Sequence, residues 1–444
     1  MKSNDPLLRA WEKTLARKKD AAAIFDTRGE VLRTFHDIEN EARAIESKMR
    51  PVKPGNITAI DIGNHQDWPS IFLACLRKQR VVLPLDRSMR QQERDKAVAM
   101  CNASALRDWH GAPPRLFKLT SGTTAAPRAI RFRSEQLLAD CNQICETMGI
   151  SDADLNFGVI PISHSYGFSN LLTPLLAHGV PMVLSQDRTP RAVLDDLART
   201  GATVFPGMPI FYQAFCEMEN VPALPKLRLC ISAGAPLSAT VAKKFREKFK
   251  QPIHSFYGAS ECGGICYDSE AANDIEGFVG AAMKGVDLEI VDAKAKSSQV
   301  RVRSAAAGDS YFPEPDEEKL SGGCFIPDDL LTRRGSGFKI VGRVSDVINV
   351  AGKKVNPAEV EAHLLRFAGV RQAVAFGRES ALRNEEVVAC VVGDADLREN
   401  DLLEFCRSGL SAWQAPKRIF VIDAIPVNER GKISRRELAR RFAM

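Results

Sequence analysis

The stretch Leu119-Thr120-Ser121-Gly122-Thr123-Thr124-Ala125-Ala126-Pro127-Arg128 gathers four hydroxyl side chains around one glycine. A segment with basic residues precedes it at residues 115–118, and an apolar strand pattern follows it at residues 129–132. In a loop between strands, such hydroxyls and the neighbouring backbone N–H groups can hold a polyphosphate. Taken alone, however, the stretch favours an ordinary Thr/Ser turn.

Two later stretches carry residue types suited to a nucleotide. In Phe256-Tyr257-Gly258-Ala259-Ser260-Glu261, the aromatic ring can stack on a purine, the glycine allows a close approach and the carboxylate can hold Mg²⁺. Upstream, Ser232-Ala233-Gly234-Ala235-Pro236-Leu237 reads as a tight turn that can lie flat against a base. The alternative is a strand end with a solvated acid.

Two strings follow in the last third of the chain. One begins at Asp328-Asp329-Leu330, continues through residues 337–346 and reaches Gly352 and residues 357–361. Its aspartate can accept both ribose hydroxyls, and Arg343 can reach a phosphate or the ribose. The other, residues 426–435, places Lys432 on a glycine-marked loop before a helix. Singly, these strings are also compatible with a charged surface hairpin and an ordinary helix-entry loop.

In this order, the four strings closely resemble the AMP-forming adenylate-forming superfamily, which includes acyl- and aryl-CoA synthetases, peptide-synthetase adenylation domains and firefly luciferase. The resemblance covers nearly the whole chain. It implies a large N-terminal domain, a small mobile C-terminal domain and an active site between them. It also implies ATP and Mg²⁺ as cofactors and coenzyme A or a phosphopantetheine arm as the acyl acceptor.

The resemblance assigns a site residue by residue. It implies that Lys432, Glu261 and Thr120 are catalytic, that Glu261 also holds the metal, that Gly352 lines the thiol tunnel and that Ser345 is the hinge. The implied nucleotide-binding residues are Thr120, Ser121, Gly122, Thr123, Thr124, Arg128, Gly234, Ala235, Pro236, Tyr257, Gly258, Ser260, Glu261, Asp329, Arg343 and Lys432.

The chain departs from the family pattern at several positions. Ala125, Arg128 and Ala129 replace the usual glycine, lysine and glycine of the phosphate loop; arginine keeps the charge but forks it, and alanine stiffens the loop. Ser345 stands where the family has an Asp or Lys hinge. These departures leave a nucleotide-binding homologue without catalytic activity as an alternative.

The resemblance places the acyl pocket at residues 161–170, with His164, Tyr166 and Gly167 as lining residues. Amino-acid-activating relatives carry an aspartate there, because a buried ammonium needs a paired charge. Counting back from Gly179 without gaps, that position is Tyr166, so an amino acid is disfavoured. Residues 161–168 are more similar to fatty-acyl and aryl-acid ligases, which favours a fatty or aryl acid. A standalone amino-acid adenylation module remains an alternative. His164 is equally compatible with a structural role.

The rest of the sequence sets the fold class. Short apolar runs alternate with helical patterns, which predicts an α/β protein, with a large N-terminal domain of β-sheets flanked by helices at residues 1–343. Shorter elements predict a small α+β C-terminal domain at residues 344–444, and the resemblance implies that this domain is mobile. Helical patterns are expected at residues 134–148, 239–249 and 357–367.

Composition narrows the compartment and the partners. The 444 residues carry a net charge of +6, which can help attract phosphate-bearing ligands but is weak support for a nucleic-acid partner; the arginines at 435, 436, 440 and 441 are expected on a solvated helix face. The eleven cysteines lack paired metal spacing, Cys262 and Cys266 included, and the N-terminus is too polar for a signal peptide. We therefore expect a cytoplasmic enzyme with no membrane span, a small carboxylic acid as substrate and, as a possible partner, a separate acyl carrier protein.

Overall fold

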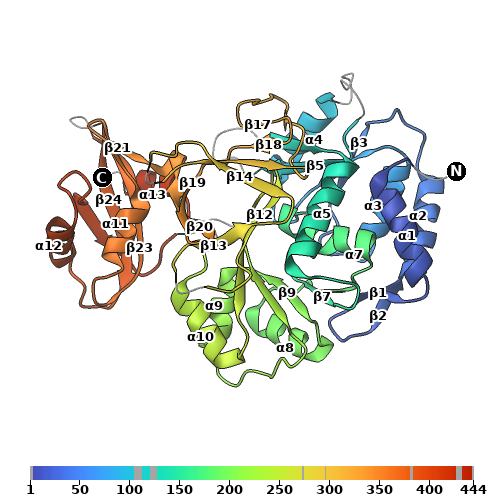
Figure 1. The fold of residues 1–444 in the computed structure, drawn as a ribbon, viewed down its shortest axis with the longest axis horizontal. Helices are drawn as coiled ribbons and strands as arrows, with labels where there is room; N and C mark the ends of the chain where they lie inside the picture. Colours follow the sequence, from blue (N-terminus) through green and yellow to red (C-terminus); the bar gives the residue numbers. More distant parts are fainter. Residues whose placement is uncertain are drawn as a thin grey trace. The chain divides into compact units, whose positions relative to one another are not determined.

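The computed structural model describes residues 4–104, 113–120, 128–272, 275–295, 297–380, 384–426 and 433–442. The chain divides into two compact units. The large unit contains residues 1–289, 301–327 and 333–339, and the small unit contains residues 290–300, 328–332 and 340–444. The predicted α/β class, with a large sheet-rich part and a smaller C-terminal part, is confirmed (Figure 1). The predicted boundary after Arg343 and the predicted mobility stay predictions.

The main sheet of the large unit has parallel strands at its centre. Its order is β20-β13-β12-β11-β10-β9-β7-β8-β1-β2, and the strands from β11 to β1 in this order run parallel. Every residue of β9 and β10 is buried, as expected for parallel strands covered on both faces. The strands are β1 (Ala22–Phe25), β2 (Val31–Thr34), β7 (Asn156–Gly158), β8 (Met182–Leu184), β9 (Val204–Gly207), β10 (Leu229–Ser232), β11 (Ile253–Ala259), β12 (Gly263–Tyr267), β13 (Phe278–Ala282) and β20 (Gly337–Arg343), with β19 (Asp329–Arg334) beyond β20.

Three helices cover one face of these strands: α8 (Pro190–Thr200), α9 (Pro209–Glu217) and α10 (Ala239–Phe249) (Figure 1, green). Their shared core is rich in aromatic rings, and Phe205 of β9 contacts Tyr212 and Phe215 of α9. Local sequence sets the ends of α8, because Pro190 stands in its first turn and Gly201 ends it with a φ of +64°.

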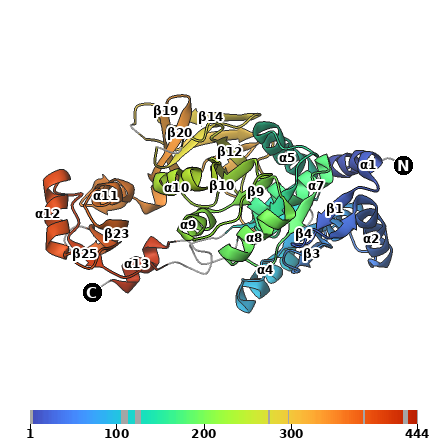
Figure 2. The same ribbon diagram turned by 90° about the horizontal axis from the view of Figure 1, so that it is seen from below.

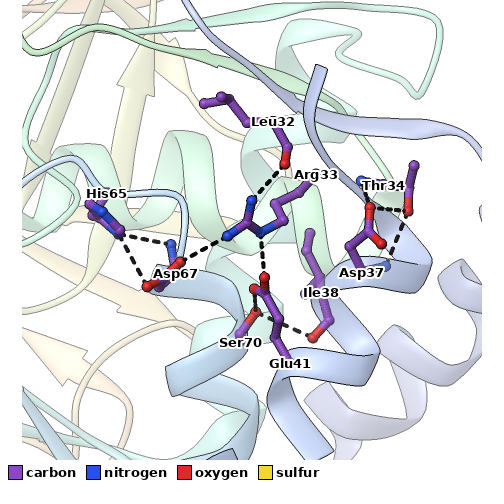
Figure 3. A network of polar contacts seen from close by, with 9 residues as sticks. All are labelled: Leu32, Arg33, Thr34, Asp37, Ile38, Glu41, His65, Asp67 and Ser70. Atoms are coloured by element: carbon purple, nitrogen blue, oxygen red, sulfur yellow. Dashed lines mark hydrogen bonds and ion pairs between the residues drawn. The ribbon is translucent and has the colours of Figure 1, made fainter. Parts of the chain in front are cut away.

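A second group of helices packs together: α1 (Pro6–Lys18), α5 (Ser134–Met148) and α7 (Thr173–His178). The remaining helical elements of the large unit are α2 (Phe35–Lys48), α3 (Trp68–Arg77), α4 (Gln91–Ser104), α6 (Ser165–Gly167) and the π-helical turn η1 (Phe168–Leu172). A polar network joins β2, α2 and α3 at the N-terminal edge (Figure 3). There, Arg33 pairs with Glu41 at 2.6 Å and with Asp67 at 3.5 Å.

Two smaller sheets complete the large unit. One has the order β16-β6-β5-β4-β3 and the other the order β14-β15-β18-β17. The first sheet matters for the site, because its β5–β6 hairpin carries the hydroxyl-rich stretch. The strands are β3 (Ile57–Ile60), β4 (Val81–Pro84), β5 (Leu116–Thr120), β6 (Arg128–Phe132), β14 (Val286–Ile290), β15 (Val300–Ser304), β16 (Tyr311–Phe312), β17 (Leu320–Ser321) and β18 (Cys324–Phe325).

The small unit is a five-stranded sheet with helices on both faces (Figure 2). Alternate residues of β23 and β24 face opposite cores, as the two-residue strand period requires: Ala375 and Ala389 pack with α11 and α12, whereas Phe376 and Val388 pack with α13. Its elements are η2 (Val344–Asp346), β21 (Ile348–Val350), β22 (Lys353–Val355), α11 (Pro357–Leu364), β23 (Val370–Ser380), β24 (Asn384–Gly393), α12 (Glu399–Gly409), β25 (Arg418–Val421) and α13 (Arg435–Arg441). Among the described residues of the chain, no helix is long and apolar enough to cross a membrane.

Candidate active site

The hydroxyl-rich stretch joins two antiparallel strands. Thr120 ends β5 and stands opposite Arg128, the first residue of β6, and its hydroxyl donates to the Arg128 carbonyl at 3.3 Å. The predicted phosphate-binding residues Ser121, Gly122, Thr123 and Thr124 lie outside the described residues, so their assignment stays a prediction. The β5–β6 hairpin therefore fixes the positions of the two ends of the hydroxyl-rich stretch, Thr120 and Arg128.

A chain of contacts connects this hairpin to Glu261. The Arg128 guanidinium lies 4.0 Å from the centre of the Tyr311 ring, and the Tyr311 hydroxyl donates to Glu261 Oε1 at 3.1 Å. Burial raises the pKa of Tyr311, and the neighbouring Glu261 carboxylate raises it further, so the phenol keeps its proton for this bond. A carboxylate held in this way is a suitable ligand for Mg²⁺.

The turn that carries Glu261 is built by glycines that leave no room for a side chain. A Cβ on Gly258 would come 2.7 Å from the Gly263 carbonyl oxygen, and a Cβ on Gly263 would come 2.0 Å from Asp140. Gly263 also has a φ of +71°. Cys262 and Cys266 of this turn and strand are fully buried, which agrees with the expectation that they are small core residues.

The predicted adenine-binding residues lie at the carboxyl ends of two central strands of the main sheet, β10 and β11. Gly234, Ala235 and Pro236 are exposed on the turn that follows β10, and Gly234 has a φ of +85°. The neighbouring parallel strand β11 pairs Ser255 with Ser232 and carries buried Tyr257 two residues further on. The structure thus places the turn and Tyr257 at the carboxyl ends of adjacent strands.

The predicted acyl segment contacts the Glu261 turn. The Ser165 hydroxyl donates to the Ser260 hydroxyl oxygen at 2.9 Å, and the rings of Tyr166 and Phe256 are 5.9 Å apart. The Tyr166 hydroxyl donates to the Gly207 carbonyl at 3.3 Å, and burial raises its pKa, so the side chain is a neutral donor. Residue 166 therefore presents a neutral hydroxyl group and no carboxylate that could pair with an ammonium group.

The other two predicted acyl-pocket residues differ from each other. His164 is exposed in front of α6. Gly167 is buried, and a Cβ there would come 2.1 Å from the Pro161 carbonyl oxygen. Close packing of α6 against the preceding segment therefore explains why residue 167 is glycine, whether or not it also lines a pocket.

In the small unit, Asp329 and Arg343 form an ion pair, with Arg343 Nε and Asp329 Oδ1 2.8 Å apart. Both were predicted at the ribose, and the structure brings them together on β19 and β20. The Asp329 side chain is 14% exposed and the Arg343 side chain 60% exposed, so the pair borders the solvent. Ser345 is exposed in η2, directly after this arginine.

Gly352 forms the tip of the β21–β22 hairpin. It has a φ of +84°, its N–H donates to Asn349 Oδ1 at 2.9 Å, and a Cβ there would have no described atom within 4 Å. The adjacent Lys353 ammonium lies 4.0 Å from the centre of the Trp413 ring. The tip is an exposed turn that depends on glycine for its backbone angle.

Lys432 lies outside the described residues, but the segment that follows it is held firmly. The Arg435 guanidinium pairs with Asp346 at 2.6 Å and Glu361 at 2.7 Å, and it donates to the Ala375 carbonyl at 2.9 Å. The expectation that Arg435 lies on a solvated helix face was wrong, because these partners come from three other elements. Arg436 beside it is exposed, as expected.

Comparisons with known proteins decide the family. The model for AMP-binding enzymes matches residues 113–302, and the model for the AMP-binding enzyme C-terminal domain matches residues 359–432. The chain belongs to the adenylate-forming superfamily. The first match includes Thr120 and Glu261, and the second ends at Lys432.

Relatives of this adenylate-forming protein act on different acceptors. A probable CoA ligase of Humulus lupulus is 28% identical over 346 residues, which are 74% of this chain and 66% of that protein, just under two thirds of its length. A 3,4-dihydroxybenzoate–[aryl-carrier protein] ligase of Bacillus anthracis is 26% identical over 327 residues, 73% of each chain. The crystal structure of ATP-bound MatB from Rhodopseudomonas palustris matches with a TM-score of 0.84 and 21% identity over 98% of both chains, which shows the shared fold.

One residue that sequence reasoning missed, Asp140, supports the Glu261 turn. Asp140 on α5 accepts the Gly264 N–H at 3.1 Å and the Ser169 hydroxyl at 2.5 Å, and it lies 4.0 Å from the Lys118 ammonium. Burial lowers the pKa of Lys118, while Asp140 opposes that shift. The sequence signal that could have revealed Asp140 is an acidic residue within the apolar helix pattern at residues 134–148, because a buried carboxylate needs partners.

Asn64 is a second missed residue. Its buried amide donates to the carbonyls of Gly158, Ile160 and Ser185, and its oxygen accepts the Ile162 N–H at 2.9 Å. One side chain therefore holds the segment that leads into the predicted acyl pocket. No local pattern marks a lone asparagine as the partner of segments about 100 residues away.

A pocket of about 340 Å³ opens next to Asn64. Besides His65 and Leu184 it is lined by the carboxylates of Asp26, Asp187 and Asp196. None of the predicted site residues lines it, and its acidic lining is unsuited to a carboxylate or a polyphosphate.

Proposed function

We propose that this protein adenylates a fatty or aryl carboxylic acid with ATP, releases pyrophosphate and transfers the acyl group to a thiol. The observation that carries the proposal is the contact chain from the β5–β6 hairpin through Arg128 and Tyr311 to Glu261. It joins the predicted phosphate loop to the predicted metal ligand in a family defined by AMP binding.

Each residue has a specific task in the first half-reaction. Thr120 and Arg128 hold the ends of the phosphate loop, and the Arg128 charge helps to offset the charge of the polyphosphate. Tyr311 fixes the orientation of the Glu261 carboxylate. Mg²⁺ bound there would neutralise phosphate charge. Lys432 offsets the repulsion between the carboxylate and the α-phosphate as they meet, which is electrostatic stabilisation of the transition state.

The acid is proposed from the residue at position 166. Tyr166 is a neutral, partly buried hydroxyl donor to the Gly207 carbonyl, and the site has no carboxylate there for the ammonium group of an amino acid. The uncharged ring contacts Phe256, which suits an apolar acyl or aryl group.

For the second half-reaction, we place the pantetheine arm at the Gly352 hairpin. The turn is exposed and carries only the Ala351 methyl group beside Gly352, and Lys353 and Lys354 are exposed next to it, where they can meet phosphates. Coenzyme A and the phosphopantetheine arm of a carrier protein share this chemistry. Of the two relatives named above, one is a probable CoA ligase and the other is a ligase for an aryl-carrier protein.

The test is pyrophosphate formation by the purified protein with ATP, Mg²⁺ and a panel of fatty, aryl and amino acids, each with and without coenzyme A. We expect pyrophosphate with at least one fatty or aryl acid, and an acyl thioester when the correct thiol is present. Release with amino acids alone would support the amino-acid adenylating module instead. ATP binding without pyrophosphate from any acid would support the non-catalytic homologue, for which the altered phosphate loop and Ser345 are the reason.

A further inference from the structure

Three side chains of types that can bind metals meet where α5 packs against α7. Cys141 and Cys145 lie four residues apart on α5, and His178 is the last residue of α7. One ligand atom from each lies within 4.8 Å of the others. Residues at i and i+4 share one face of a helix, and α5 and α7 pack together, so the fold itself assembles the group.

The distances suit a single ion. With metal–sulfur bonds of about 2.3 Å and metal–nitrogen bonds of about 2.0 Å, the ligand atoms of a tetrahedral site lie roughly 3.5 to 4 Å apart. The present spacing exceeds that by at most about 1 Å, which side-chain rotation can close. Cys141 and Cys145 are buried, whereas His178 is partly exposed and gives the ion a route from solvent.

One ring nitrogen of His178 has a side-chain partner on α5. His178 Nε2 lies 2.9 Å from the Asn142 side-chain oxygen, and in the tautomer whose Nε2 donates to that oxygen, Nδ1 keeps the lone pair that an ion needs. Metal-binding histidines commonly have such an outer partner.

We propose that Cys141, Cys145 and His178 form a binding site for a thiophilic divalent ion such as Zn²⁺. Binding replaces the two thiol protons, which pass to solvent, and the ion with two thiolates and a neutral imidazole has no net charge. Neutrality matters because the cysteines are buried, and an unpaired charge there would be costly. A monovalent ion would leave one negative charge.

The site has a structural consequence for α5. Asp140 precedes Cys141 on this helix and accepts the Gly264 N–H of the Glu261 turn. An ion that joins α5 to the end of α7 stabilises the folded state by mass action. We therefore expect Zn²⁺ to raise the melting temperature of the full chain.

The experiment is a titration of the reduced, metal-free full chain with Zn²⁺ against a chromophoric chelator, and with Co²⁺ followed by absorption. The parent should bind one ion per chain and show thiolate-to-cobalt charge-transfer absorption. Cys141→Ala, Cys145→Ala and His178→Gln should each weaken Zn²⁺ binding at least tenfold. His178→Gln keeps a polar, partly exposed side chain, so it tests the site even if a cysteine variant folds poorly.

Cys75→Ala is the matched control, because Cys75 is another buried cysteine of the large unit that is not part of the group. It should bind Zn²⁺ as the parent does. Equal Zn²⁺ binding by the parent and His178→Gln would overturn the proposal. So would charge-transfer absorption that persists in the Cys141→Ala/Cys145→Ala double variant.

Discussion

The turn that carries Glu261 and the hairpin that carries Gly352 both depend on glycine, but for different reasons. Around Glu261, Gly258 and Gly263 are required because neighbouring atoms would collide with a Cβ. At Gly352 nothing described lies within 4 Å of a Cβ, and only the backbone angle requires glycine.

The difference separates a rigid site from an accessible one. The Glu261 turn is held by Asp140, Tyr311 and close backbone contacts, as a group that must be aligned before reaction requires. The Gly352 hairpin is exposed and open at its tip, as a surface that a thiol arm must approach requires. Substitutions around Glu261 therefore test the charge and the rigidity of that turn. Substitutions at the Gly352 hairpin test whether a thiol arm can approach it.

The largest expected effect is at Glu261. Glu261→Gln should lower acid-dependent pyrophosphate release by about 100-fold or more, about 2.7 kcal/mol, because an amide binds Mg²⁺ poorly. Glu247→Gln on the exposed face of α10 is the matched control and should behave as the parent. Near-normal turnover with unchanged Mg²⁺ dependence in Glu261→Gln would contradict the metal assignment.

Asp140 tests the rigidity of the same turn. Asp140→Ala removes a partner of Lys118, and both side chains are 4% exposed. Leaving a buried charge unpaired should lower the free energy of unfolding by about 3 kcal/mol or more. Asp195→Ala removes an exposed ion pair with Arg191 and should cost less than about 1 kcal/mol. Denaturant unfolding measures both, and equal losses would argue against a special role for the buried pair.

Arg435 tests the order of the small unit. Arg435→Gln breaks contacts to Asp346, Glu361 and Ala375 and should lower the free energy of unfolding by about 1 to 2 kcal/mol. Arg436→Gln, at the exposed neighbouring position, should have little effect. If the two variants unfolded at the same denaturant concentration, the three contacts of Arg435 would not stabilise the unit.

Local sequence predicted the bounds of some helices. The helices at residues 134–148 and 239–249 have the predicted bounds, because an apolar face and a turn signal mark each one. The helix expected at residues 357–367 ends at Leu364 instead. Helix ends depend on capping contacts that a periodic pattern does not contain.

Site residues were predicted only where they belong to one of the four sequence motifs. The proximity of Asp329 and Arg343 was expected from the resemblance, although their ion pair was not, whereas the bond from Tyr311 to Glu261 joins residues 50 positions apart that share no motif. Asn64, Asp140 and the Cys141 group were missed for the same reason. Their partners come from distant elements, and only the packed fold brings them together.

Gly352 has the smallest expected effect on stability. Gly352→Leu should cost only about 1 kcal/mol of backbone strain at its φ of +84°, yet slow thioester formation from preformed acyl-adenylate more than pyrophosphate release. Gly29→Leu is the matched control, because Gly29 has a φ of +87° and equally open surroundings. It should share the strain but leave both half-reactions unchanged. Equal slowing of the two steps by Gly352→Leu would contradict a role at the thiol tunnel.

The most direct test of the two-step account measures both half-reactions, and the melting temperature, in Lys432→Ala. We expect adenylation to slow by a barrier of about 3 kcal/mol, because the lysine offsets charge only while the adenylate forms. Supplied with prepared acyl-adenylate and a thiol, the variant should make thioester at close to the parent rate. Equal losses in both half-reactions together with a lower melting temperature would contradict the account, because Lys432 would then serve the fold and not the first step.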